Sequence, residues 1–168
     1  ATPNFVLGNH DKPRLASQIG VQQARIAAML LLTLRGTPTL YYGDEIGMTN
    51  VEIPPDKIQD PQGANNAGFN RDEARTPMQW DERPHAGFCP PDATPWLSLS
   101  DDAGAINVVM EREYNTSMLS LYHQLLQFRR ETPALHSGKY IPLDTGPWVF
   151  SYLREYGDER YLIALNFT

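Results

Sequence analysis

The pattern that most constrains this chain is a pair of short apolar runs separated by one helical segment. The first run, residues 5–8, ends in a polar trio, and the second, residues 38–42, ends in Gly43, Asp44 and Glu45. Short runs of this kind are typical of strands buried on both faces of a parallel sheet. Between them, apolar residues recur at helical spacing, and we expect Gly36 to end that helix. The sequence therefore predicts a strand–helix–strand unit.

The rest of the chain divides into three parts. Residues 46–110 hold most of the prolines with little periodicity, and we interpret them as a long excursion of loops and short helices. An amphipathic helix is predicted from Thr116 or Ser117 to Glu131, with arginines near its end. From Trp148 onward, alternating apolar residues on both sides of a Gly-Asp turn predict a β-hairpin. This change of pattern predicts a domain boundary near residues 133–140.

Charge and apolar content argue against two classes of partner. Twenty acidic residues against fourteen Lys and Arg give a net charge of -6 without a basic block, so we expect no nucleic-acid partner. The longest strictly apolar run, residues 26–32, is far below the roughly 20 residues that cross a bilayer, and no signal peptide is evident, so we expect no membrane partner. A single cysteine, Cys89, excludes an internal disulfide and suits a cytoplasmic protein. Because residue 1 is not Met and residues 161–168 resemble an unfinished strand, we expect a fragment.

Asn9, His10 and Asp11 are the first candidates for a functional site. A His beside an Asp is often an ordinary hydrogen-bonded pair, and that reading stays open from the triplet alone. However, this trio directly follows an apolar run and would lie at the carboxyl end of a strand, where barrel enzymes build their sites.

Three segments together resemble a known family. Residues 5–14 (FVLGNHDKPR) resemble the fourth conserved region of the α-amylase superfamily of glycoside hydrolases, and residues 36–48 (GTPTLYYGDEIGM) resemble its eighth-strand region. Residues 75–81 (RTPMQWD) resemble a segment typical of its α-glucosidase and oligo-1,6-glucosidase branch. The resemblance implies an α/β fold: the carboxyl-terminal part of a (β/α)8 TIM barrel, strand 7 to helix 8, in residues 1–132, and the truncated start of an antiparallel β domain in residues 133–168.

The resemblance also implies an activity and a set of site residues. The family hydrolyses or transfers α-linked glucose with retention, using a nucleophilic aspartate and a general-acid glutamate whose motifs do not occur in this sequence. It assigns Asp11 as the third carboxylate, a transition-state stabiliser, with His10 beside it, and Arg75 as the anchor of the terminal sugar's 4-hydroxyl together with an upstream Asp. Arg14 is a possible further member that either balances nearby carboxylates or forms an ion pair at a helix entry. We expect no cofactor and no metal.

The implied parent is an exo-acting α-glucosidase whose partners are a small α-glucoside and an amino-terminal barrel segment of the same protein. Trehalose synthase, sucrose isomerase and sucrose hydrolase share these regions and stay open, as does the non-catalytic, glucosidase-like heavy subunit of amino-acid transporters. Asp44 and Glu45 are interpreted as structural, because neighbours on a strand point to opposite faces. Aromatic residues of the same regions are expected to pack rather than bind sugar: Tyr41, Tyr42 and Trp80. Three further histidines show no ligand-like spacing: His85, His123 and His136.

Overall fold

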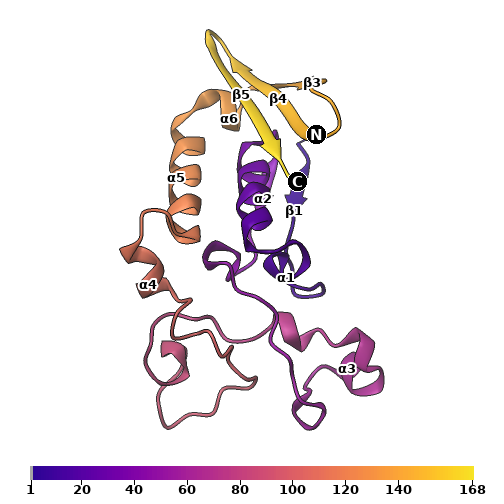
Figure 1. The fold of residues 1–168 in the computed structure, drawn as a ribbon, viewed down its shortest axis with the longest axis vertical. Coiled ribbons are helices and arrows are strands. Elements are labelled where there is room, and N and C mark those ends of the chain that lie inside the picture. Colours follow the sequence, from indigo (N-terminus) through magenta and orange to yellow (C-terminus); the bar gives the residue numbers. More distant parts are fainter. Residues whose placement is uncertain (1) are drawn as a thin grey trace.

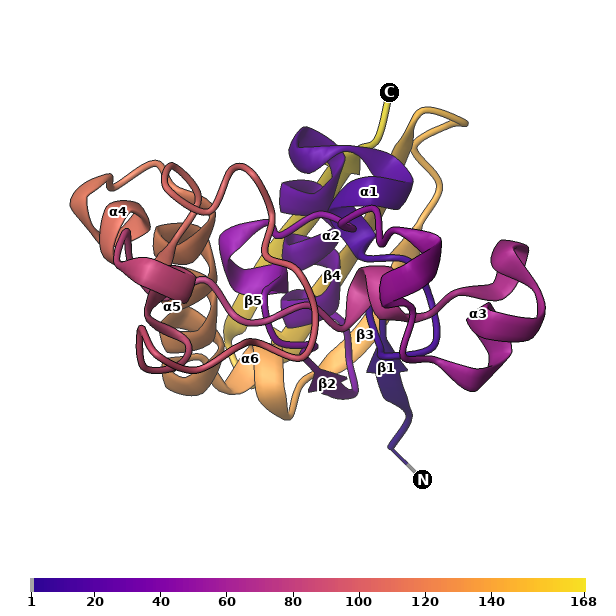
Figure 2. The same ribbon diagram turned by 90° about the horizontal axis from the view of Figure 1, so that it is seen from below.

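A computed structural model describes residues 2–168 and arranges them in three tiers (Figure 1). At one end lies an antiparallel sheet of β3 (Lys139–Leu143), β4 (Val149–Tyr156) and β5 (Glu159–Asn166), ordered β3-β4-β5. The long helices lie in the middle, and the excursion between residues 46 and 107 forms the other end. Viewed from below, the excursion spreads across the molecule from α3 (Pro61–Asn65) to α4 (Val108–Glu113) (Figure 2).

The strand–helix–strand unit is confirmed, with shorter strands than predicted. β1 (Asn4–Val6) pairs in parallel with β2 (Thr37–Thr39), and α2 (Val21–Thr33) connects them. The expectation that both faces of these strands are buried is wrong for this chain, since Val6 is 44% exposed. In both strands the first and third residues are exposed and the middle one is half-buried, so one face of this small sheet has no covering layer among the described residues.

Two details around α2 differ from the prediction. A separate short helix, α1 (Leu15–Ile19), precedes it, and α2 ends at Thr33, three residues before the expected stop. Gly36 is needed for a different reason: a Cβ there would lie 2.6 Å from the Phe5 ring and 2.8 Å from the carbonyl oxygen of Pro3. The glycine therefore lets the start of β2 approach β1, rather than ending the helix.

The second helix and the hairpin are confirmed. α5 (Met118–Glu131) begins where Ser117 Oγ accepts a hydrogen bond from the Ser120 amide at 3.0 Å, and the turn joining β4 to β5 contains Gly157 at a φ of 57°. The short helix α6 (Pro133–His136) and strand β3 were not predicted. No helix within residues 2–168 is long and apolar enough to cross a membrane.

Two apolar clusters hold the tiers together. Small residues along α2 let α1 and α5 pack closely against it, and the largest cluster contains Leu15, Ala16, Ala24, Ala27, Ala28, Leu32, Met118 and Tyr122. The other face of α2 packs against the antiparallel sheet through a second cluster built on Leu135, Tyr152, Ile163 and Leu165. α2 is therefore shared between the helical tier and the sheet.

Arg129, expected near the end of α5, is buried and lies against the turn between α2 and β2. Its Nη1 donates to the carbonyl oxygens of Leu32 (2.8 Å) and Leu34 (3.0 Å), and its Nη2 donates to that of Gly36 (2.5 Å). One guanidinium thus satisfies three backbone acceptors of the connection that leads into β2.

We expect Arg129→Met to lower the free energy of unfolding by about 3 kcal/mol, because it leaves three carbonyl groups without a donor in a buried setting. Arg130→Met is the matched control, since the neighbouring Arg130 side chain is 78% exposed and surface changes cost little. Chemical denaturation of the protein that carries this chain measures both. Equal effects of the two substitutions would contradict a supporting role for Arg129.

Candidate active site at the ends of β1 and β2

The polar trio after β1 forms a compact turn. Asn9 Oδ1 accepts a hydrogen bond from the Asp11 amide at 2.8 Å, a local side-chain bond that competes with continuation of the strand. His10 Nε2 lies 3.3 Å from Asp11 Oδ2, and the side chains of His10 and Asp11 are 66% and 48% exposed. Asn9 therefore holds the backbone of Asp11, and the Asp11 carboxylate is accessible to a ligand on one side.

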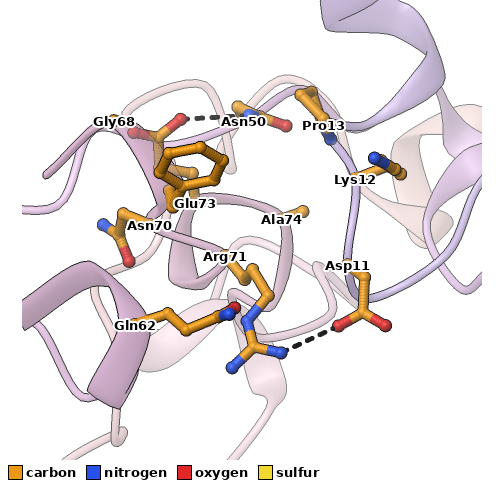
Figure 3. A pocket seen from close by; sticks show the side chains of 11 residues that line it. Asp11, Lys12, Pro13, Asn50, Gln62, Gly68, Asn70, Arg71, Glu73 and Ala74 are labelled. Atoms are coloured by element: carbon orange, nitrogen blue, oxygen red, sulfur yellow. Dashed lines mark hydrogen bonds and ion pairs between the residues drawn. The ribbon is translucent and has the colours of Figure 1, made fainter. Parts of the chain in front are cut away.

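Two arginines hold the other oxygen of Asp11. Arg75 Nη2 donates to Asp11 Oδ1 at 3.1 Å, and Arg75 Nε donates to the His10 carbonyl oxygen at 2.8 Å. Arg71 Nη1 donates to the same Asp11 Oδ1 at 3.2 Å (Figure 3). The structure thus brings together His10, Asp11 and Arg75, the three predicted site residues, and adds Arg71.

Arg71 is the residue that sequence reasoning missed. The only signal is its closeness in sequence to Arg75: the two arginines flank a short 3-10 turn, Asp72–Ala74. Its orientation depends on the buried carboxylate of Asp60, which accepts two hydrogen bonds from the guanidinium. Arg71 Nη2 donates to Oδ1 at 2.5 Å, and Arg71 Nε donates to Oδ2 at 2.9 Å. This bidentate contact with Arg71 holds the pKa of Asp60 well below its usual range.

Arg14 lies beneath this site rather than in it. Its side chain is fully buried, its Nη1 donates to the Tyr42 carbonyl oxygen at 2.7 Å, and its guanidinium carbon lies 5.3 Å and 4.8 Å from the ring centroids of Tyr41 and Tyr42. Within residues 2–168 it forms no ion pair shorter than 4.0 Å, so an ion pair at the helix entry does not hold it. Its charge acts instead on the buried carboxyl of Asp44.

The two tyrosines connect β2 to the segment that carries the arginines. The Tyr41 hydroxyl donates to the Ala74 carbonyl oxygen at 3.0 Å, and the Tyr42 hydroxyl donates to that of Thr76 at 2.7 Å. These bonds bracket Arg75 on both sides. Tyr41 and Tyr42 therefore serve packing and positioning, in line with the expectation for them.

Asp44 and Glu45 lie in a 3-10 turn, Asp44–Ile46, and not at a strand end, so the strand geometry used to separate them is wrong. Gly43 adopts a left-handed conformation at φ 88° that turns the chain before a strand could continue. Glu45 Oε2 accepts from the Gly43 amide at 2.7 Å, and Asp44 is buried. The structural interpretation of both carboxylates remains consistent with these contacts.

A cavity of about 520 Å³ opens beside Asp11. Figure 3 shows Asp11 and Arg71 on one side of it and Gln62, Asn70, Asn50 and Glu73 around the rest, with Asn50 bonded to Glu73. The lining mixes amide, carboxylate and guanidinium groups with the exposed ring of Phe69. Such a lining suits a ligand rich in hydroxyl groups.

The remaining candidates lie apart from this cavity. Trp80 is 47% exposed and lines a separate cavity with Glu45 and His123, while His85 lines a third one. Across the described residues, no three His, Cys, Asp or Glu side chains are grouped as a metal ion would require.

Comparison with known proteins gives one family match. Residues 1–138 match the family described as "Alpha amylase, catalytic domain". The chain is 36% identical to an oligo-1,6-glucosidase of Halalkalibacterium halodurans, over 95% of this chain and 33% of the relative. It is 35% identical to an alpha-glucosidase of Apis mellifera, over 99% of this chain and 30% of the relative.

A solved structure agrees in fold. The trehalulose synthase MutB from Pseudomonas mesoacidophila superimposes with a TM-score of 0.85 at 34% identity, over 98% of this chain and 34% of that one. The chain therefore spans about a third of the length of the proteins it matches.

The buried carboxyl of Asp44 predicts a pH dependence of stability. Burial raises its pKa from 3.8 to about 6, and the Arg14 charge offsets this only in part. An acid whose pKa is raised by folding favours the folded state while protonated, so the free energy of unfolding falls as pH rises from about 4 to about 6. The difference in pKa corresponds to roughly 3 kcal/mol.

We expect Asp44→Asn to remove this slope, so that the variant gains stability relative to the wild type as pH rises from about 4 to 7. Denaturant unfolding at a series of pH values measures the difference. Asp158→Asn, at the exposed β4–β5 turn, is the control and should follow the wild type. A pH-independent difference between Asp44→Asn and wild type would be inconsistent with a raised pKa.

Proposed function

The chain belongs to the alpha-amylase family, whose catalytic domain its residues 1–138 match, and from this premise we propose that it is part of a retaining, exo-acting α-glucosidase that hydrolyses or transglucosylates small α-glucosides. The relatives confirm the predicted fold class, the carboxyl-terminal part of the barrel followed by antiparallel β structure. The observation that carries the proposal is the Asp11 carboxylate, which two arginines orient beside His10 at the end of β1.

Asp11 suits the role of a transition-state stabiliser. Its Oδ1 is engaged by Arg71 and Arg75, while Oδ2 faces His10 on the exposed side. Glycosidic cleavage passes through a flattened, oxocarbenium-like sugar ring, and hydrogen bonds to its hydroxyls tighten as that ring forms. Asp11 would accept from the 2- and 3-hydroxyls, and His10 would donate to one of them. Because both arginines are already in place, the carboxylate needs no rearrangement when the charge develops.

Arg75 would complete the pocket around the terminal sugar. Its Nε and Nη2 are engaged by His10 and Asp11, and among the described residues its Nη1 takes no partner. A guanidinium held at two points presents its remaining hydrogens in a fixed direction. We propose that these hydrogens reach the 4-hydroxyl of a nonreducing-end glucose, which favours action on chain ends. The upstream Asp predicted to share this task is not a residue of this chain.

The rest of the reaction needs groups from outside these 168 residues. We propose that the nucleophilic aspartate and the general-acid glutamate are supplied by the amino-terminal barrel segment of the same protein, the chain's main partner. Residues 1–132 would complete that barrel, and residues 133–168 would begin the β domain. The cavity beside Asp11, of about 520 Å³, would receive the leaving sugar or the acceptor.

Isomerisation of sucrose is the second candidate function. It is favoured by the superposition on a trehalulose synthase and would use the same Asp11 environment, with the released sugar retained in the cavity beside it. Product analysis on maltose, isomaltose, sucrose and trehalose separates hydrolysis, transfer and isomerisation. The intact arrangement of His10, Asp11 and Arg75 argues against a non-catalytic, transporter-type role. The free, half-buried Cys89 agrees with the proposed cytoplasmic location.

We expect Asp11→Asn, in the protein that carries this chain, to lower kcat by about 10² to 10³, the usual loss for a preorganised polar group at a developing charge. The fold should survive, because the Asp11 side chain is half exposed. Steady-state kinetics on an aryl α-glucoside measures the effect, with Asp158→Asn as the control. Near-normal turnover of Asp11→Asn would contradict the assignment of Asp11 as a transition-state stabiliser.

Residues 1–168 alone should not cleave an aryl α-glucoside. They hold the groups that orient the substrate but neither the nucleophile nor the acid of a retaining mechanism. An activity assay of the purified chain, with the whole protein as the positive control, tests this expectation. Measurable hydrolysis by the chain alone would mean that the catalytic pair has been assigned to the wrong part of the protein.

A further inference from the structure

A second cavity lies within the excursion, away from Asp11. It has a volume of about 380 Å³ and forms between residues 56–59 and residues 94–99, with His85 at one side. None of its lining residues lines the cavity beside Asp11. This second cavity is therefore separate from the Asp11 carboxylate and from the cavity beside it, which we propose to hold the leaving sugar or the acceptor.

Trp96 is an exposed aromatic residue in the lining of this cavity. Its side chain is 53% exposed, whereas the neighbouring Leu97 is only 4% exposed and anchors the segment in the interior. The exposed indole presents an apolar aromatic face beside the cavity, a surface on which a ligand with an apolar face can stack. The exposed ring provides a flat platform on a wall that is fixed from behind.

Hydrogen-bonding groups surround that platform. The lining includes the carboxylate of Asp56, the amide of Gln59, the hydroxyls of Thr94 and Ser98, and the imidazole of His85. The adjacent charges of Asp56 and Lys57 are of opposite sign, so the rim has no net charge. An aromatic face beside hydroxyl and amide groups and one pair of opposite charges matches a neutral ligand with one apolar face and many hydroxyls, which is the chemistry of a hexose ring.

The walls are held in place before any ligand arrives. The backbone N–H of Gln59 donates to Asp72 Oδ2 at 2.6 Å, and His85 Nε2 lies 3.3 Å from the Pro91 carbonyl oxygen. His85 also has a φ of 58°, a left-handed conformation that is uncommon outside glycine and is imposed by its surroundings. A fixed cavity loses less conformational entropy on binding than a mobile one.

We propose that this cavity is a second, non-catalytic saccharide-binding site, in which one glucosyl unit of an α-linked oligosaccharide stacks on Trp96. The choice of an α-glucoside as the ligand rests on the proposed function, whereas the site itself rests on the cavity and the exposed indole. The site shares a support with the Asp11 region: Asp72 Oδ2 accepts from the amides of both Gln59 and Asp60, and Asp60 holds Arg71. It binds sugar without contacting the reacting bond.

The test uses the whole protein that carries this chain, with Asp11→Asn to prevent turnover, titrated with maltotriose by isothermal titration calorimetry. We expect two classes of site in this background. Adding Trp96→Ala should weaken one of them at least about tenfold and leave the other unchanged. Trp96→Phe keeps an aromatic face and should restore binding to within a few-fold. Trp148→Ala, which removes a Trp that is 69% exposed on the antiparallel sheet, should leave both sites intact.

Trp96→Ala in the otherwise wild-type protein should keep normal turnover of an aryl α-glucoside, because that substrate occupies only the Asp11 site. If Trp96→Ala does not fold, Thr94→Tyr, which fills the cavity from its exposed rim, should remove the same binding event. A single class of site, or two classes that both survive Trp96→Ala and Thr94→Tyr, would overturn the proposal. Failure of the proposed function has a different signature, namely normal turnover of Asp11→Asn.

Discussion

The arrangement of the site depends on one buried cation. The guanidinium of Arg14, three residues beyond Asp11, packs against both Tyr41 and Tyr42, whose rings contact each other edge-on, and it donates to the Tyr42 carbonyl oxygen. Contacts of this kind contribute about 2 kcal/mol when water is excluded. They fix the turn after β1 against the end of β2, which a two-stranded parallel sheet of three residues each could not do alone. Gly43 is required for the same packing, since a Cβ there would lie 2.6 Å from Arg14 Nη1.

The same tyrosines place the arginines opposite the carboxylate. Their hydroxyls donate to the carbonyl oxygens of the residues on either side of Arg75. Through these tyrosines, Arg14 positions both the turn that carries Asp11 and the segment that carries Arg75. Charge is then arranged in sequence: Asp60 fixes Arg71, and Arg71 with Arg75 fixes Asp11. In this series each charge has an opposite charge within hydrogen-bond distance, which limits the desolvation penalty. Within this cluster, as far as the described residues show, Asp11 Oδ2, His10 and Arg75 Nη1 remain available to a ligand.

The sequence predicts the periodic parts of this structure and misses the parts that depend on backbone acceptors. α2, α5 and the β4–β5 hairpin carry strong periodic patterns, and the proximity of Asp11 to Arg75 follows from the family resemblance. Arg71 could not be found in this way, because it lies outside the three segments that carry the resemblance and its partner Asp60 lies in an aperiodic stretch. The burial of Arg14 was also invisible, since its main acceptor is a carbonyl oxygen, a group that every residue carries.

The antiparallel sheet also contributes to the site, through the connection between α2 and β2. Arg129 of α5 binds three carbonyls in residues 32–36, and Arg154 of β4 donates to the Thr33 carbonyl and, at 3.1 Å, to that of Gly138. Thr33 Oγ1 is also 2.6 Å from the Tyr152 hydroxyl. α5 and β4, which both follow the excursion in the chain, therefore hydrogen-bond to the residues that lead directly into β2. Because Tyr41 and Tyr42 follow β2 directly in the chain, the position of Asp11 relative to Arg75 depends on Arg129 and Arg154 as well as on the strands themselves.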